Sequence, residues 1–440
     1  MVLLRRTHRR AAGSDVIGAP VPRILILSTT TGYQLRSFGD SAARAGIDLI
    51  FATDRCHRLD DPWRDQAVPV RFHEEDASLA AIVAAATDRP IDGVLPVGDR
   101  PVVLAARAAQ ALGLRGNPPD AAQASVNKVL SRERFAAAGL AVPWVIAVPP
   151  EAPDDPRIQY PCVVKPLGLS GSRGVIRADT RGQLDAAIAR VRALLSRKDV
   201  RAARSGLDDR LLIEGFIEGR EFAIEGILTN GVLRAFAIFD KPDPLDGPYF
   251  EETIYVTPSG LSRDEQSAVL DHVQRAAAAI GLTDGPLHAE CRIGAQGVFM
   301  LEAAARPIGG LCARVLQFTA SSHAGKVPLE EVLLRHAAGA DVSVYEREAQ
   351  AAAVMMIPIP KRGILKHVDG IESAAALPRI EEVRITAKKD QLLERLPEAG
   401  SYLGFIFARG PSPQDLVSAL KGAHSRLRFH IDTPLTIVSS

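Results

Sequence analysis

The sequence predicts an α/β protein that begins with a doubly wound parallel sheet and becomes α+β in its central part. Short apolar strands alternate with helices from residue 23 onward, which is typical of an open parallel sheet. The strands expected there are 24–27, 48–52 and 93–97, and the helices are 34–45, 77–86, 102–114 and 121–138. No G-x-G-x-x-G follows the first strand, which argues against a dinucleotide site. After residue 156, neighbouring strands are joined by short turns, which favours antiparallel pairing.

Short strands follow one another more closely after residue 156. The strands expected there are 162–165, 174–178, 211–214, 221–228, 232–240, 287–293 and 298–303, with a helix at 181–195. A charged stretch at 341–350 precedes a final α+β unit. We therefore expect a leader at 1–22, an N-terminal domain at 23–115, a central domain at 116–345 and a C-terminal domain at 346–440.

Composition excludes several classes of protein. Hydrophobic residues make up 47% of the 440 residues, which is enough for packed cores. Lys and Arg number 53 against 52 acidic residues, so a partner such as nucleic acid or an anionic membrane is not expected. The four cysteines, Cys56, Cys162, Cys291 and Cys312, form no C-x-x-C pair, and no apolar run is long enough to span a bilayer. We expect a cytoplasmic protein with reduced thiols.

A glycine-rich loop follows the strand that ends at Lys165. It contains Gly168, Gly171 and Gly174, which let backbone N–H groups approach an anion. Ser170, Ser172 and Arg173 add donors, and Lys165 adds a charge. The alternative is a flexible hairpin with a surface lysine.

A second segment, 211–225, carries Glu214 at the end of an apolar strand and Glu221 at the start of the next. Backbone groups of Gly215, Phe216 and Ile217 are placed to pair with an adenine edge, and Glu221 to accept from ribose hydroxyls. The alternative is a hairpin whose acidic side chains face water.

The segment 287–302 predicts a β-hairpin with Glu290 directly opposite Glu302. A three-residue loop at 295–297 gives this register, with Gly297 in the left-handed region. Alternation places His288, Glu290 and Arg292 on one face. The opposite, apolar face is expected to hold Ala289, Cys291, Ile293, Phe299, Leu301 and Ala303.

Two facing carboxylates repel each other unless a positive charge lies between them. Mg²⁺ bound by carboxylates and nucleotide phosphates is a usual solution. The alternatives are neutralisation by Arg292 or another base, and a zinc site that uses His288, which suits two carboxylates less well.

Arg306 follows four residues after Glu302, and Gly309 and Gly310 precede an expected helix at 311–317. Exposed N–H groups at the start of a helix bind anions, and the Arg306 guanidinium suits a phosphate or a carboxylate. The alternative is a capping loop with a solvent-exposed arginine.

In their order along the chain, these residues resemble the ATP-grasp superfamily. The matching pieces run from Asn127-Lys128 through 161–165, 213–217 and 219–221 to His288-Ala-Glu290 and Glu302 with Arg306. The resemblance implies an ATP-grasp fold with a mobile lid at about 155–225, and it implies ATP and Mg²⁺, with Mn²⁺ as a substitute, as cofactors. It also implies a homodimer.

The resemblance implies a role for each matching residue. Lys128, Lys165 and the glycine loop would hold the phosphates, Glu214 and Ile217 would contact adenine, and Glu221 the ribose. Glu290 and Glu302 would bind the metal. Many members have Glu-x-Asn at the last metal strand, whereas this chain has Glu302-Ala-Ala304, which leaves the number of ions open.

Within the superfamily, the segments 247–258, 306–312 and 400–409 resemble carboxylate–amine ligases, including bacterial L-amino-acid ligases. There Glu252 would recognise a substrate amino group and Arg306 a carboxylate or phosphoryl group. Dipeptide ligases often have histidine where this chain has Tyr255. The expected function is ATP-dependent amide formation from a carboxylate and an amine through an acylphosphate. The alternatives are biotin-carboxylase-like or purine-pathway chemistry, and a catalytically silent ATP-binding module.

Overall fold

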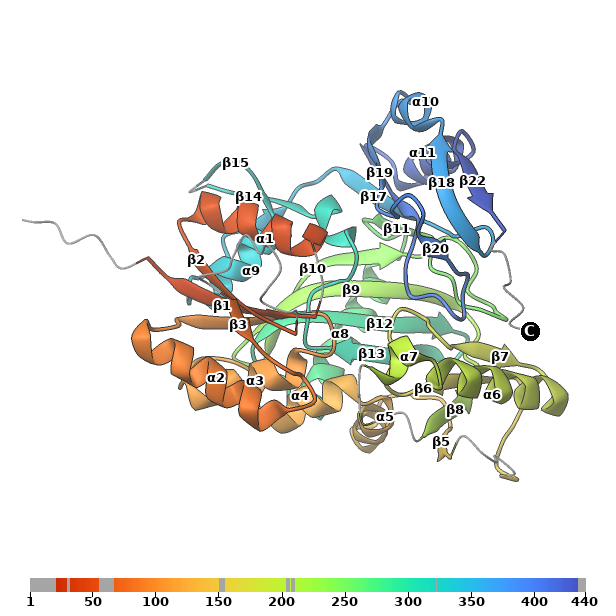
Figure 1. Ribbon diagram of the computed structural model, residues 1–440, viewed down its shortest axis with the longest axis horizontal. Helices are drawn as coiled ribbons and strands as arrows, with labels where there is room; N and C mark the ends of the chain where they lie inside the picture. Colours follow the sequence, from red (N-terminus) through yellow and green to blue (C-terminus); the bar gives the residue numbers. More distant parts are fainter. Residues whose placement is uncertain are drawn as a thin grey trace, which may run out of the picture.

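The computed structural model describes residues 21–29, 32–54, 67–149, 155–202, 206, 210–321 and 323–433. The expected leader and Cys56 therefore lie outside the described residues, apart from Val21 and Pro22. The chain forms a small parallel sheet, a long antiparallel sheet and three smaller sheets, with helices packed against their faces (Figure 1).

The N-terminal sheet is parallel throughout, in the order β3-β2-β1-β4. Its strands are β1 (Arg23–Ser28), β2 (Asp48–Thr53), β3 (Ala67–Pro69) and β4 (Gly93–Val97). One face packs against α1 (Gly32–Ala45) and α9 (Leu329–Ala337), and the other against α2 (Glu75–Asp88) and α3 (Val102–Ala111). Ile24 and Ile26 point to the first face, whereas Leu25 and Leu27 point to the second. The predicted doubly wound sheet is confirmed.

A second unit is a four-stranded antiparallel sheet covered by a helix. Its strands are β5 (Val145–Val148), β6 (Cys162–Pro166), β7 (Ile176–Ala178) and β8 (Leu211–Gly215), in the order β5-β8-β6-β7. The covering helix α6 (Arg181–Leu195) buries Leu184, Ile188 and Val191 against this sheet, and the short helix α7 (Lys198–Arg201) follows it. We call the sheet β5-β8-β6-β7 the lid sheet, after the lid expected at about 155–225.

The largest sheet has eight antiparallel strands and continues into the C-terminal part of the chain, in the order β13-β12-β9-β10-β11-β17-β21-β19. Its strands are β9 (Arg220–Thr229), β10 (Val232–Asp240), β11 (Ile254–Thr257), β12 (Gly285–Gly294), β13 (Gly297–Ala304), β17 (Ala351–Ile357), β19 (Ile380–Ile385) and β21 (Gly404–Gly410). One face is covered by α4 (Pro119–Val126), α5 (Lys128–Ala137) and α8 (Arg263–Ile280) near β12 and β13. Near β17 and β21 it is covered by α11 (Pro413–His424), with α10 (Ile371–Ala375) beside β19.

Two three-stranded sheets complete the described fold. One contains β14 (Gln317–Ala320), β15 (His323–Pro328) and β16 (Glu346–Arg347), and the other β18 (Gly363–Asp369), β20 (Leu392–Leu393) and β22 (Arg428–Asp432). None of the described helices is long and apolar enough to cross a membrane. The three described cysteines, Cys162, Cys291 and Cys312, are buried free thiols.

Three sequence-based expectations about local structure are wrong. The helix expected at 121–138 is two helices, because Asn127 is extended and caps α5 by accepting from the N–H groups of Val129 and Leu130. The helix expected at 311–317 is only the 3₁₀ turn η1 (Cys312–Val315). Gly309 and Gly310 therefore precede no α-helix, and the dipole argument for an anion at that point is lost.

The third correction concerns the β12–β13 hairpin. Gly294 pairs with Gly297, so the loop has two residues, and an irregularity beside Glu290 and Leu301 restores the predicted pairing of Glu290 with Glu302. Because the extra residue shifts the alternation, Val298 and Met300 enter the core in place of Phe299 and Leu301. The pairing of Glu290 with Glu302 is confirmed, although the loop that was expected to produce it is not.

Candidate active site

The lid sheet, the long sheet and the N-terminal sheet meet around a cluster of charged side chains. Glu290 and Glu302 come from β12 and β13, Lys165 and Glu214 from β6 and β8, and Lys128 from the first turn of α5. Asp99 follows β4, at the carboxyl edge of the parallel sheet, where ligands bind in open α/β folds.

Lys165 and Glu214 form a buried ion pair across the lid sheet. The Lys165 Nζ lies 2.5 Å from Glu214 Oε1, and Arg132 Nε lies 3.2 Å from Glu214 Oε2. Burial alone would raise the pKa of Glu214, but the charges of Arg132 and Lys165 outweigh it and lower that pKa to about 2. Arg132 is 1% exposed, so removal of Glu214 would leave an uncompensated buried charge at a cost of about 3–5 kcal/mol.

Lys128 lies at the point where the glycine loop meets the carboxylates of Glu302 and Asp99. Its Nζ donates to the carbonyl oxygen of Leu169 at 3.0 Å, next to Ser170. Burial lowers the pKa of Lys128, while the charges of Glu302 and Asp99 act in the opposite direction. Ser172, Gly171 and Gly174 adopt positive φ angles of 57°, 62° and 76°, so the loop curves tightly over this point.

Arg306 joins the N-terminal sheet to β13. Its Nε lies 2.7 Å from Asp99 Oδ1, and its NH2 lies 3.2 Å from Glu302 Oε1. Burial alone would lower the pKa of Arg306, but Asp99 and Glu302 outweigh it and raise that pKa, so the guanidinium is permanently charged. Arg306 thus contacts Glu302, four residues before it in the chain.

Three carboxylates converge on Lys241, a residue that the sequence analysis did not select. Its Nζ lies 2.7 Å from Glu221, 2.6 Å from Glu252 and 2.8 Å from Glu290, measured to Oε1 in each case. The Lys241 side chain is only 3% exposed. The base that neutralises Glu290 is therefore Lys241. Arg292 instead binds Glu221 Oε2 at 2.8 Å and the carbonyl oxygen of Ile217 at 2.7 Å.

Glu252 is the titratable member of this group. Burial raises its pKa to about 7, and repulsion from Glu290 and Glu221 adds to that effect, although Lys241 opposes it. In Glu290 the balance is reversed: burial would raise its pKa, but Lys241 and His288 hold that pKa well below its usual value. The two carboxyl groups thus differ in charge near neutral pH although both contact the same ammonium.

His288 connects Glu290 to a deeper acid. Its Nδ1 lies 3.1 Å from Glu225 Oε2, and its Nε2 lies 3.7 Å from Glu290 Oε1. Burial would lower the pKa of His288, but hydrogen bonds to the two carboxylates raise it to about 9. Tyr255, in place of the histidine seen in many dipeptide ligases, directs its hydroxyl to Glu290 Oε1 at 3.4 Å.

The remaining predicted residues lie at the edges of the cluster. The Phe216 ring packs beside Phe250, and the guanidinium of Arg177 lies 4.1 Å from the centroid of the Phe216 ring. Gly310 has a φ of 63° and lies against the ring of Phe405, whereas Gly309 has open space around it. Ser170 lies near Asp99 and contributes to the lowered pKa of that carboxyl, so the glycine loop lies close to the end of β4.

The sequence analysis missed Asp99, Arg132, Glu225 and Lys241. Asp99 had a usable signal, since it follows an apolar parallel strand at its carboxyl end. Lys241 had a weaker one. A plain hairpin register between β9 and β10 does not place it beside Glu221, and the irregularity between Ala235 and Ala237 that does so is invisible in the sequence.

Three protein-family models match the chain. They describe an ATP-grasp N-terminal domain at 39–116, an ATP-grasp domain at 158–315 and an L-amino acid ligase C-terminal domain 2 at 355–432. The chain is 26% identical over 396 residues to uncharacterized protein y4rH of Sinorhizobium fredii, covering 89% of this chain and 79% of that protein. It is 27% identical over 245 residues to human carnosine synthase 1, covering 53% of this chain and 29% of that protein.

Among solved structures, an L-amino acid ligase from Bacillus licheniformis is similar with a TM-score of 0.76 and 23% identity, covering 94% of this chain and 99% of that chain. That likeness shows the shared fold. The chain spans less than a third of the length of the human relative.

Together these matches establish the class of protein: the chain belongs to the ATP-grasp superfamily. Within it, the chain is related to the L-amino acid ligases. The predicted fold, family and enzyme class, an ATP-dependent ligase, are confirmed. Such enzymes use ATP with a divalent metal and act on small molecules.

Proposed function

We propose that this protein joins the carboxylate of one small, amino-acid-like molecule to the amine of another through an acylphosphate. The observation that carries the proposal is the arrangement of Lys128, Lys165 and Arg306 around the facing pair Glu290 and Glu302. Three cations and two acidic metal ligands at one point suit a reaction in which several anions must be brought together.

The nucleotide would lie between the lid sheet and the long sheet. Lys128, Lys165 and the N–H groups of the loop 168–174 would contact the phosphates. Backbone groups at Phe216 and Ile217 would pair with adenine beside Glu214, and Glu221 would accept from the ribose. In the structure Glu214 pairs with Lys165, and Glu221 with Lys241 and Arg292. Bound ATP would exchange for some of these contacts.

The donor set fits a hard divalent ion. Glu290 and Glu302 face each other on adjacent strands, and their side chains are 19% and 31% exposed, so both are reachable from the cluster. Carboxylate oxygens are the donors that Mg²⁺ prefers, and we propose Mg²⁺, with Mn²⁺ as a substitute. When bound, the ion would supply positive charge beside the transferring phosphoryl group. Ala304 offers no further ligand, so the protein supplies two carboxylates here.

The substrate amino group would be recognised by Glu252. This carboxyl group is largely buried, its charge is poised near neutral pH, and it lies beside Tyr255 and Lys241. His288 and Arg306 line the same cluster from β12 and the loop after β13. A cationic His288 and a permanently charged Arg306 suit a substrate carboxylate.

The reaction would proceed in two steps. A carboxylate oxygen of the first substrate attacks the γ-phosphorus of ATP, the bond to the β–γ bridging oxygen breaks, and acylphosphate and ADP form. The amine nitrogen of the second substrate then attacks the acyl carbon, inorganic phosphate leaves, and the nitrogen loses a proton. Arg306, Lys128 and Lys165 would offset the negative charge that builds in both steps. Closure of the lid sheet would keep water from the acylphosphate.

The test is ADP and phosphate release from Mg-ATP across a panel of amino acids, offered singly and in pairs. The proposal expects release that requires both a carboxylate and an amine and that disappears in Glu302→Gln with the fold unchanged. Release that depends on bicarbonate would indicate a carboxylase-like reaction instead. Bound ATP with no release under any pairing would indicate a silent ATP-binding module.

A further inference from the structure

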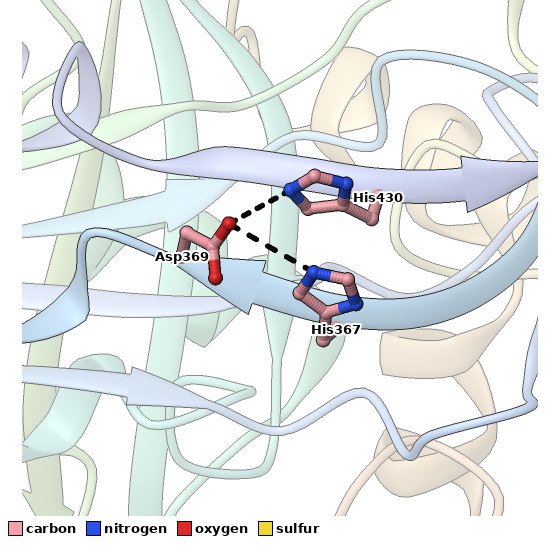
Figure 2. Close-up of side chains that lie close together, drawn as sticks. All are labelled: His367, Asp369 and His430. Atoms are coloured by element: carbon pink, nitrogen blue, oxygen red, sulfur yellow. Dashed lines mark hydrogen bonds and ion pairs between the residues drawn. The ribbon is translucent and has the colours of Figure 1, made fainter.

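Two histidines and an aspartate converge on the surface of the C-terminal part, on the sheet formed by β18, β20 and β22. His367 and Asp369 lie two residues apart on β18, so their side chains share one face, and His430 is the cross-strand partner of His367 on β22. Figure 2 shows both imidazole rings directing a nitrogen toward the same carboxylate oxygen.

The polar atoms of the three side chains lie close together. Asp369 Oδ2 lies 2.8 Å from His430 Nε2 and 3.8 Å from His367 Nε2, and the three ligand atoms all lie within 4.8 Å of one another. Zn–N and Zn–O bonds of about 2.0 Å in a tetrahedral site separate neighbouring ligand atoms by about 3.3 Å. The two measured distances fall on either side of that value.

We propose that His367, Asp369 and His430 bind a divalent transition-metal ion of the zinc type, independently of the ATP site. Two imidazoles and one carboxylate suit Zn²⁺, Ni²⁺ or Co²⁺ better than Mg²⁺, which prefers an all-oxygen shell. Water would complete the coordination, because the three side chains are 46–58% exposed.

Binding requires one rearrangement. The rings of His367 and His430 are stacked, with centroids 3.9 Å apart and planes 13° from parallel, so their nitrogen lone pairs do not yet point at one site. Rotation of the half-exposed rings about their side-chain bonds would converge both Nε2 atoms on an ion above Asp369. The ion would then link β18 to β22 and so tie residue 430 to residue 367.

The site differs from the candidate active site in place and chemistry. It lies on the small C-terminal sheet, whereas Glu290 and Glu302 lie on β12 and β13 at the other end of the long sheet (Figure 1). The active-site carboxylates can be saturated with millimolar Mg²⁺, which leaves an imidazole site free. Binding to the histidine site is therefore measurable without reference to ATP turnover.

The experiment is calorimetric titration of the untagged full-length chain with Zn²⁺ in excess Mg²⁺, together with the visible absorption of Co²⁺. We expect one ion per chain, with affinity reduced about tenfold or more in His430→Gln and in Asp369→Asn. The His272→Gln variant, which alters a partly exposed histidine on α8, should bind Zn²⁺ as the unaltered protein does. Folding of each variant is checked by circular dichroism.

Two results would overturn the proposal. One is Zn²⁺ binding that is equal in the unaltered protein and in both cluster variants, which would place the ion elsewhere. The other is Zn²⁺ binding by the unaltered protein that is no tighter than Zn²⁺ binding by a His367→Gln/His430→Gln double variant. The three residues would then be a hydrogen-bonded surface cluster in which His430 donates to Asp369.

Discussion

Lys241 Nζ lies 2.8 Å from Oε1 of Glu290, one of the two carboxylates proposed to bind metal. The same ammonium contacts Glu221 and Glu252, so one buried positive charge holds three negative ones together. The geometry of the site therefore depends on a residue that is neither an acid nor part of the glycine loop. Its removal is the most informative test of how the cluster is held.

Lys241→Gln should destabilise the protein more at pH 8 than at pH 5.5. Without the ammonium, the three carboxylates repel each other in a buried setting, and the pKa values of Glu252 and Glu290 rise above the unfolded values. A raised carboxyl pKa penalises the folded state at high pH, and the penalty shrinks as protons bind at lower pH. We expect a loss of about 3–5 kcal/mol at pH 8 by urea unfolding.

Lys421→Gln is the matched control for that prediction. Lys421 pairs with Asp243 at 2.6 Å, but its side chain is 54% exposed, so its removal should cost about 1 kcal/mol or less. Equal losses for the two variants would show that the carboxylates around Lys241 are not held by its charge.

The pH dependence of kcat/KM should follow Glu252. Its pKa is raised to about 7, so below that pH the carboxyl is neutral and cannot pair with a substrate ammonium. We expect kcat/KM for the amino-bearing substrate to fall about tenfold for each pH unit below the pKa. Glu252→Gln should lower kcat/KM at neutral pH and abolish this acidic limb. An unchanged acidic limb in the variant would assign it to another group.

The contact between α6 and the loop 394–400 should help to hold the lid sheet closed. Arg190 binds Glu398 through two hydrogen bonds of 2.5 and 2.9 Å, and Gly174 N donates to the carbonyl oxygen of Pro397 at 2.8 Å. Because Arg190 is 42% exposed, we expect Arg190→Gln to raise the KM for ATP only about two- to fivefold.

Arg181→Gln provides the comparison within the same helix. Arg181 pairs with Asp185 at 3.0 Å on the exposed face of α6, so this ion pair lies within the helix. The KM of the Arg181→Gln variant for ATP should stay unchanged. If both variants raised KM equally, the effect would come from the helix surface and not from the contact with Glu398.

Gly310→Ala should destabilise the loop after β13, whereas Gly309→Ala should not. Gly310 has a φ of 63°, and a Cβ there would lie 3.2 Å from the Phe405 ring, while nothing lies within 4 Å of a Cβ at Gly309. Left-handed backbone costs a non-glycine residue about 1–3 kcal/mol. The free energy of unfolding in urea measures the difference, and equal values would contradict it.

Most of the fold was predictable because periodicity and order along the chain carry it. The parallel strand 93–97, the helix 181–195 and the pairing of Glu290 with Glu302 agree with the structure. The errors arise where a single residue decides the outcome. Asn127 divides a helical stretch through its side-chain cap, and one extra residue in β13 exchanges Leu301 for Met300 in the core.

The site was predictable only where its residues follow a motif. Lys165, Glu290 and Glu302 lie in strands that the sequence makes visible, and Arg306 follows the last of them. Lys241 and Arg132 hold the cluster through contacts between segments that are distant in sequence, and no local pattern reports such contacts. The domain limits and the individual roles of the site residues remain predictions.

The most direct test of the proposed reaction uses a carboxylate substrate labelled with ¹⁸O in its carboxyl group. If a carboxylate oxygen attacks the γ-phosphorus of ATP, one labelled oxygen must leave with the inorganic phosphate. The account predicts one ¹⁸O per phosphate released in the complete reaction, detected by mass spectrometry, and no release from Glu302→Gln. Amide formation with unlabelled phosphate would contradict the acylphosphate and, with it, the proposed ligase mechanism.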